Sequence, residues 1–106
     1  MTAQDNSRPA TISPAQATAH AKLIATAQAH RETGRPVPCT GPNRTAWIQD
    51  RDADMGHAVD QCHACPVLEP CTDYALTHAE PAGVWGGLTP ARRAELRRAA
   101  ARPAAA

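Results

Sequence analysis

The chain is short and has few large apolar side chains: 106 residues with a formal net charge of +1, two tryptophans, one tyrosine and no phenylalanine. One domain is expected at this length, and its core needs a covalent or metal cross-link for support. No segment reaches the ~20 apolar residues of a membrane span, and none has the basic start and apolar run of a secretory signal. We therefore expect a soluble, cytoplasmic protein with no membrane partner.

Charge is divided unevenly along the chain. Residues 1–38 carry +2 (four basic and two acidic side chains), residues 39–82 carry −5 (two and seven), and residues 83–106 carry +4 (five and one). A basic tail behind an acidic centre indicates an anionic partner for the tail.

The first 38 residues are interpreted as an N-terminal extension, with a disordered start over residues 1–12 and a helix after it. Ser13 can cap this helix, Pro14 suits its first turn, and Gln16 completes a capping box. Gly34 marks the end of the helix. Its apolar residues form only a thin stripe at four-residue spacing, so we expect it to be loosely docked.

Two short helices are predicted in the middle of the chain. Residues 52–65 are typical of a helix that leads into a cysteine pair, with Asp52 or Asp54 as its cap. A turn over 66–69 and a helix that starts at Pro70 follow, because a proline several residues inside a helix removes a hydrogen bond and clashes with the preceding turn.

A glycine-rich turn opens the C-terminal part. The string GVWGG at residues 83–87 allows positive φ angles without steric cost, and it fits a tight hairpin-like bend with Trp85 displayed beside it. The same string also fits a turn whose tryptophan fills a small core. Thr89 and Pro90 then start a last helix, which ends at Pro103, and a frayed tail follows.

Four cysteines give the strongest chemical pattern, Cys39-x22-Cys62-x2-Cys65-x5-Cys71. A C-x2-C pair can direct two thiolates at one ion, but the second pair of a zinc ribbon is missing. The spacing also differs from the cysteine runs of ferredoxins. Spacing alone therefore leaves structural zinc, an iron–sulfur cluster and disulfide chemistry open, and a reducing compartment favours the metal or redox uses.

The cysteines, the glycine-rich turn and the basic segment together resemble the WhiB-like (Wbl) family of actinobacteria and their phages. CPVLEPC, YAL and GVWGGL occur in the family's order and spacing between Cys39 and Arg98. The resemblance implies a small, mostly α fold, with three to four short helices and a glycine-rich turn organised around a [4Fe-4S] cluster. Residues 39–88 would be the cluster-binding domain. The implied cluster ligands are Cys39, Cys62, Cys65 and Cys71.

The resemblance also implies a function, which is that of a transcription regulator and not of an enzyme. Such a regulator responds to redox state or nitric oxide, docks on region 4 of the primary sigma factor of RNA polymerase, and is otherwise monomeric. Its basic C-terminal segment, here residues 89–106, contacts promoter DNA. The docking residues that the resemblance implies are Trp47, Ile48, Gly83, Val84, Trp85, Gly86 and Gly87.

The chain departs from the family pattern in three places. Family members usually carry paired aromatics where this chain has Trp47 and Ile48. Pro70 replaces a residue that suits a helix better, and the tail lacks the Arg-Gly-Arg-Pro hook of some members.

Five arginines of the last helix are the candidate DNA contacts. They spread over about 280° of a helical wheel at ~100° per residue, which favours nonspecific phosphate contact over base reading. The alternative is a solvated helix end, because arginine near a C-terminus also complements the helix dipole. These residues are Arg92, Arg93, Arg97, Arg98 and Arg102.

Two other classes of protein stay open. Cys62-His63-Ala64-Cys65, followed by a proline, could serve a thiol–disulfide oxidoreductase, since a histidine inside C-x2-C can lower a thiol pKa. The chain lacks the strand pattern that a thioredoxin-like fold requires. The second alternative is a zinc-stapled adaptor that binds a protein partner.

Overall fold

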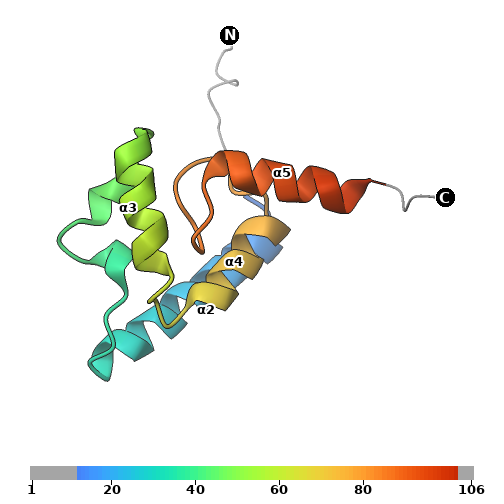
Figure 1. Ribbon diagram of the computed structural model, residues 1–106. Helices are drawn as coiled ribbons and strands as arrows, with labels where there is room; N and C mark the ends of the chain where they lie inside the picture. The colour runs from blue at the N-terminus through green and yellow to red at the C-terminus, as the bar shows by residue number, and fades with distance from the viewer. Residues whose placement is uncertain (1–11, 103–106) are drawn as a thin grey trace, which may run out of the picture.

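The computed structural model describes residues 12–102, so the expected disordered start and frayed tail lie almost wholly outside the described residues. The described part is small and mostly α, as predicted. Figure 1 shows α2 and α4 side by side and α5 across one end of α4, while α3 packs with η1 and η2. The elements are α2 (Pro14–Glu32), the 3-10 turns η1 (Pro38–Thr40) and η2 (Arg44–Trp47), α3 (Asp52–Cys62), α4 (Leu68–Thr77) and α5 (Pro90–Ala101).

Helix α2 begins where its capping signals predict. The Ser13 hydroxyl accepts a hydrogen bond from the backbone N–H of Gln16 at 3.0 Å, and Pro14 occupies the first turn. The Gln16 side chain does not close a capping box, because its Nε2 donates instead to the Tyr74 hydroxyl at 3.2 Å. Gly34 follows the helix with φ +80°. Gln16 therefore ties the start of α2 to α4.

The starts of α3 and α4 differ from the predictions. The N-cap of α3 is Arg51, which makes no side-chain capping bond, whereas Asp52 and Asp54 lie inside the first turn. Carboxylates there complement the positive end of the helix dipole. Helix α4 begins at Leu68 and not at Pro70. The proline is tolerated because N–H groups of a first turn have no helical partner anyway.

Residues 83–88 form the expected tight bend. Trp85 and Leu88 exchange backbone hydrogen bonds of 3.1 and 2.9 Å across Gly86 and Gly87, whose φ angles are +56° and +75°. Two adjacent positive φ angles are what a two-residue hairpin turn requires. The Thr89 hydroxyl then accepts from the N–H of Arg92 at 3.1 Å and caps α5.

Two small apolar clusters make up the core of the described residues. One joins α2 to α4, and the other joins η2 to α3. The buried residues of the first are Leu23, Ala27, Val37, Val67, Tyr74 and Ala75, and those of the second are Ala46, Trp47, Ala58, Cys62 and Val84. Over the same range, no helix has the combination of length and apolar character needed to cross a membrane.

Candidate metal centre

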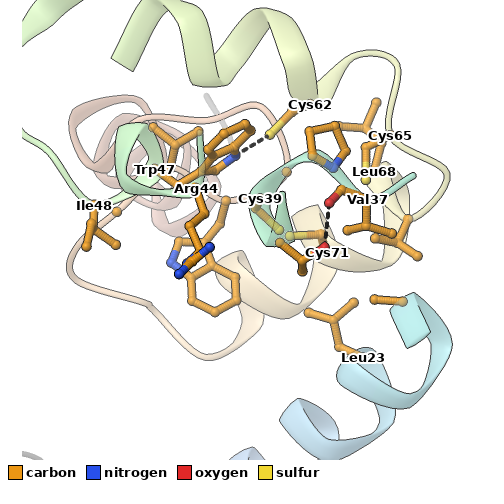
Figure 2. A pocket seen from close by; sticks show the side chains of 18 of the residues that line it. Leu23, Val37, Cys39, Arg44, Trp47, Ile48, Cys62, Cys65, Leu68 and Cys71 are labelled. Carbon is orange, nitrogen blue, oxygen red and sulfur yellow. Dashed lines mark hydrogen bonds between the residues drawn. The ribbon is translucent and has the colours of Figure 1, made fainter. Parts of the chain in front are cut away.

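The four cysteines come from separate segments and line one cavity of about 490 Å³. Cys39 lies in η1, Cys62 is the last residue of α3, Cys65 follows in the connecting turn, and Cys71 belongs to α4. Figure 2 shows all four around this cavity. The fold thus brings together the cysteines that the sequence separates by up to 32 positions.

Local hydrogen bonds hold the segments that carry the cysteines. The backbone N–H of Cys65 donates to the Cys62 carbonyl at 2.9 Å, which closes the turn between the two thiols. The backbone N–H and the hydroxyl of Thr40 both donate to the Val37 carbonyl, at 2.9 and 2.7 Å, and this shapes the turn around Cys39. The thiol positions therefore follow from the backbone.

All four thiols are free. Between residues 12 and 102, no three histidine, cysteine, aspartate or glutamate side chains gather into a group that could hold a metal ion. The sulfurs surround a space and do not meet at one point. Four free cysteine thiols around one shared cavity are consistent with a cysteine-held metal group.

Burial raises the pKa values of three of these thiols, those of Cys39, Cys65 and Cys71. The pKa of Cys71 is raised to about 12, mainly by burial and less by the neighbouring cysteines, while a hydrogen bond from the Gly86 backbone acts in the opposite direction. The thiolate is the form that ligates a metal, so loading this site releases protons.

Trp47, which the resemblance places among the docking residues, faces inward. Only 6% of it is exposed, and its indole N–H donates to the Cys62 sulfur at 3.3 Å (Figure 2). Its carbonyl accepts from the N–H of Val84 at 2.8 Å. Ile48, by contrast, is 78% exposed. Of this pair, only Ile48 presents apolar surface, while Trp47 supports a candidate ligand.

Trp85 is partly exposed beside the glycine-rich turn and partly packed in the core, so each of the two interpretations of this turn holds in part. It is half-buried, and its ring centroid lies 5.2 Å from that of Tyr74 and 6.2 Å from that of His20. Its indole N–H donates to the Ala82 carbonyl at 3.0 Å. Trp85 also lines the cysteine cavity. The turn therefore fills part of the core and borders the candidate metal site at once.

Arg93 does not fit the predicted set of DNA contacts. It is fully buried, and its guanidinium donates to the backbone carbonyls of Glu80, Ala82 and Leu88 at 2.7–3.3 Å. No surface of this side chain remains for a phosphate. Of the others, Arg92, Arg98 and Arg102 are exposed and Arg97 is half-buried.

Sequence reasoning missed the contribution of α2 to this centre. Leu23, Ala27 and Arg31 line the cavity from that helix, and Arg44 lines it from η2. The four-residue spacing of Leu23, Ala27 and Arg31 indicates that they share a face of α2, but no neighbouring residue in the sequence indicates what this face contacts.

The fold and the site define a small helical protein built around a four-cysteine centre. The sequence model of the family described as "Transcription factor WhiB" matches residues 35–96, more than half of the chain. The chain therefore belongs to the WhiB family, as its motifs predicted.

Curated relatives carry names from the same family. The chain is 33% identical over 60 residues to transcriptional regulator WhiB2 of Mycolicibacterium smegmatis, covering 57% of this chain and 46% of that protein. It is 39% identical over 51 residues to probable transcriptional regulator WhiB7 of Mycobacterium tuberculosis, covering 48% and 55%. It is 50% identical over 36 residues to the redox- and pH-responsive transcriptional regulator WhiB3 of the same species, covering 34% and 35%. The matched region thus spans between about a third and two thirds of the length of these curated relatives. No solved structure matches it.

Proposed function

We propose that this protein regulates transcription, is not an enzyme, and holds a [4Fe-4S] cluster on Cys39, Cys62, Cys65 and Cys71. It docks on region 4 of the primary sigma factor, contacts promoter DNA through α5, and responds to nitric oxide or to redox state. It acts in the cytoplasm as a monomer apart from that complex. Family membership supports the regulatory role, and the WhiB3 relative's name supports redox sensing.

The cysteine cavity is the observation that carries the proposal. Four free thiols from three elements and one turn border a single space of about 490 Å³. A single zinc ion would have to draw the sulfurs to within about 3.8 Å of one another, given Zn–S bonds of ~2.3 Å in a tetrahedron. A cubane cluster holds its cysteines farther apart, so it suits a cavity of this size better.

A bound [4Fe-4S] cluster would supply one-electron redox chemistry and a target for nitric oxide. The chain's own part is to tie η1, α3 and α4 to one centre through the four cysteines. Because loading a site of this kind is coupled to folding, the order of these elements would depend on the cofactor. Sigma-factor docking would change with that order.

The docking surface would combine Ile48 with the turn at 83–87. The turn borders the cysteine cavity, and the carbonyl of Trp47 accepts a hydrogen bond from Val84. A change at the cysteines would therefore reach this surface through directly bonded neighbours. Trp85 is the expected anchor, since half-buried aromatics tend to contribute most of an interface's energy.

The oxidoreductase alternative receives no support from Cys65. A catalytic C-x2-C thiol needs a lowered pKa, whereas burial, the largest effect, raises the pKa of Cys65. The zinc-stapled adaptor stays distinguishable by metal content alone.

The test is a measurement of iron, acid-labile sulfide and zinc per chain on protein purified without oxygen, with a visible spectrum. We expect about four iron and four sulfide per chain with a coloured product. Binding to isolated sigma region 4 is then compared between the loaded protein and its Trp85→Ala variant, which should bind more weakly. One zinc without colour would overturn the cluster. Unchanged binding of a loaded Trp85→Ala protein would overturn the docking role.

A further inference from the structure

Helix α2 forms one wall of the cysteine cavity, although it lies outside the region 35–96 that matches the family. Leu23, Ala27 and Arg31 follow one another at four-residue spacing, so they share a face of the helix. The first two are 8% and 5% exposed and pack in the core with Val37. Arg31 is the next residue of that face and remains exposed at the edge of the cavity.

Contacts near the start and in the middle of α2 hold this helix in place. Gln16 donates to the Tyr74 hydroxyl at 3.2 Å near the start of the helix, and Leu23 and Ala27 are buried in its middle. The position of Arg31 is therefore set by a docked helix and not by a free loop.

Three charged residues line the cavity, namely Arg31, Arg44 and Glu80. Glu80 accepts a hydrogen bond from the Tyr74 hydroxyl at 2.8 Å. Neither arginine forms an ion pair within residues 12–102. Arg31 and Cys39 line the same cavity.

A four-cysteine iron–sulfur centre is anionic, because four thiolates outweigh the positive charge of its core, and its potential depends on nearby charge and exposure. A cation beside it stabilises the more negative, reduced state. Leu23, Ala27 and Val37 are buried in the wall nearest to Arg31 in α2, so less water screens the cation there than on a fully open surface.

We propose that Arg31 supplies a counter-charge to the four-cysteine centre from a helix outside the family region. This charge raises the reduction potential of the centre and slows its loss in air. This inference rests on the proposed [4Fe-4S] cluster. It assigns α2 a role in adjusting how readily this particular chain responds to oxidants.

The test compares full-length loaded protein with three variants. Arg31→Gln removes the charge, Arg31→Lys keeps it, and Arg35→Gln removes an exposed charge four residues further on that does not line the cavity. The readouts are iron per chain, the midpoint potential from a mediated dithionite titration, and the rate at which visible absorbance disappears in air. We expect a more negative potential and faster loss for Arg31→Gln only, and a smaller shift at high salt.

Each outcome decides the matter. Native values for Arg31→Gln would overturn the inference and leave the cluster proposal intact. Equal shifts for Arg31→Gln and Arg35→Gln would reduce the effect to net charge and overturn it too. If Arg31→Gln fails to load while Arg31→Lys loads, the counter-charge role stands. If both fail to load, the role is structural and the inference is wrong. A native protein without iron would overturn both proposals.

Discussion

Arg93 makes four hydrogen bonds to three backbone carbonyls, of Glu80, Ala82 and Leu88, with its charge fully buried. Burial is the main cause that lowers its pKa, and the neighbouring Arg97 adds to this. The planar guanidinium spreads its donors over Nε, Nη1 and Nη2, which a compact ammonium cannot do. The side chain thus fastens α5 to the segment that precedes the glycine-rich turn.

We expect Arg93→Lys to lower the free energy of unfolding by about 2 kcal/mol, since an ammonium would leave buried carbonyls without donors. Urea denaturation of the two proteins in the same state of loading measures this. Arg92→Lys is the matched control, because Arg92 is 57% exposed, and should stay within about 0.5 kcal/mol of the native protein. Equal effects of the two substitutions would contradict the fastening role.

Trp47 gives the second test at the level of a side chain. Its indole N–H donates to the Cys62 sulfur at 3.3 Å, and hydrogen bonds to ligating sulfurs raise the potential of an iron–sulfur centre. Trp47→Phe keeps an aromatic ring and removes the donor, so the midpoint potential of the loaded protein should become more negative. Trp85→Phe is the control, since its N–H donates to the Ala82 carbonyl. A potential that moves only with Trp85→Phe would refute this assignment.

The turn at 83–88 allows backbone strain to be separated from steric crowding, because two of its glycines differ in their surroundings. Gly86 and Gly87 both have positive φ angles, but a Cβ on Gly86 would lie 2.5 Å from the Thr72 nitrogen, whereas one on Gly87 would be 3.6 Å from its nearest neighbours. The Thr72 hydroxyl also donates to the Gly86 carbonyl at 3.0 Å. The turn therefore packs directly against α4 at Gly86.

Gly87→Ala should cost about 1–2 kcal/mol for the left-handed backbone alone. Gly86→Ala should add about 1–3 kcal/mol of overpacking against Thr72. Thermal unfolding of both variants measures the difference. The close approach of turn and helix would be disproved if the two variants had the same melting temperature.

Helix starts show which parts of an element the sequence can predict. Ser13 and Thr89 cap α2 and α5 as predicted, because a cap needs only residues within one turn. The predicted start of α4 at Pro70 is two residues late, because this proline is the third residue of the helix. A proline fits anywhere among the unpaired N–H groups of a first turn, so local rules leave that choice undecided.

At the scale of the whole molecule, the cysteines were predictable and their surroundings were not. Their spacing and the motifs around them are local signals, and the structure brings the four to one cavity. The burial of Arg93, the inward indole of Trp47 and the approach of Arg31 depend on how separate elements pack. Each of these three side chains looks exposed or unspecific in the sequence, because no neighbour within one turn reveals its partner.

The charge division along the chain leads to a test of DNA binding. With Arg93 buried, α5 and the residue after it offer Arg92, Arg97, Arg98 and Arg102, and Glu95 pairs with Arg92 at 2.8 Å. Phosphate contacts release counterions, so the logarithm of the binding constant should fall steeply with the logarithm of salt concentration. The acidic centre repels DNA and the basic segment attracts it, since residues 39–82 carry −5 and residues 83–106 carry +4.

We expect Arg98→Gln to reduce the steepness of that salt dependence by about one unit, the effect of losing one phosphate contact. Fluorescence anisotropy with a labelled DNA duplex, at several salt concentrations, measures the slope for full-length protein. Arg51→Gln removes the same charge from the start of α3, where Arg51 is exposed and pairs with Asp54. A long-range effect of net charge would change both slopes alike, and this would rule out α5 as the DNA-contacting element. A lower slope for Arg98→Gln alone would place the phosphate on α5.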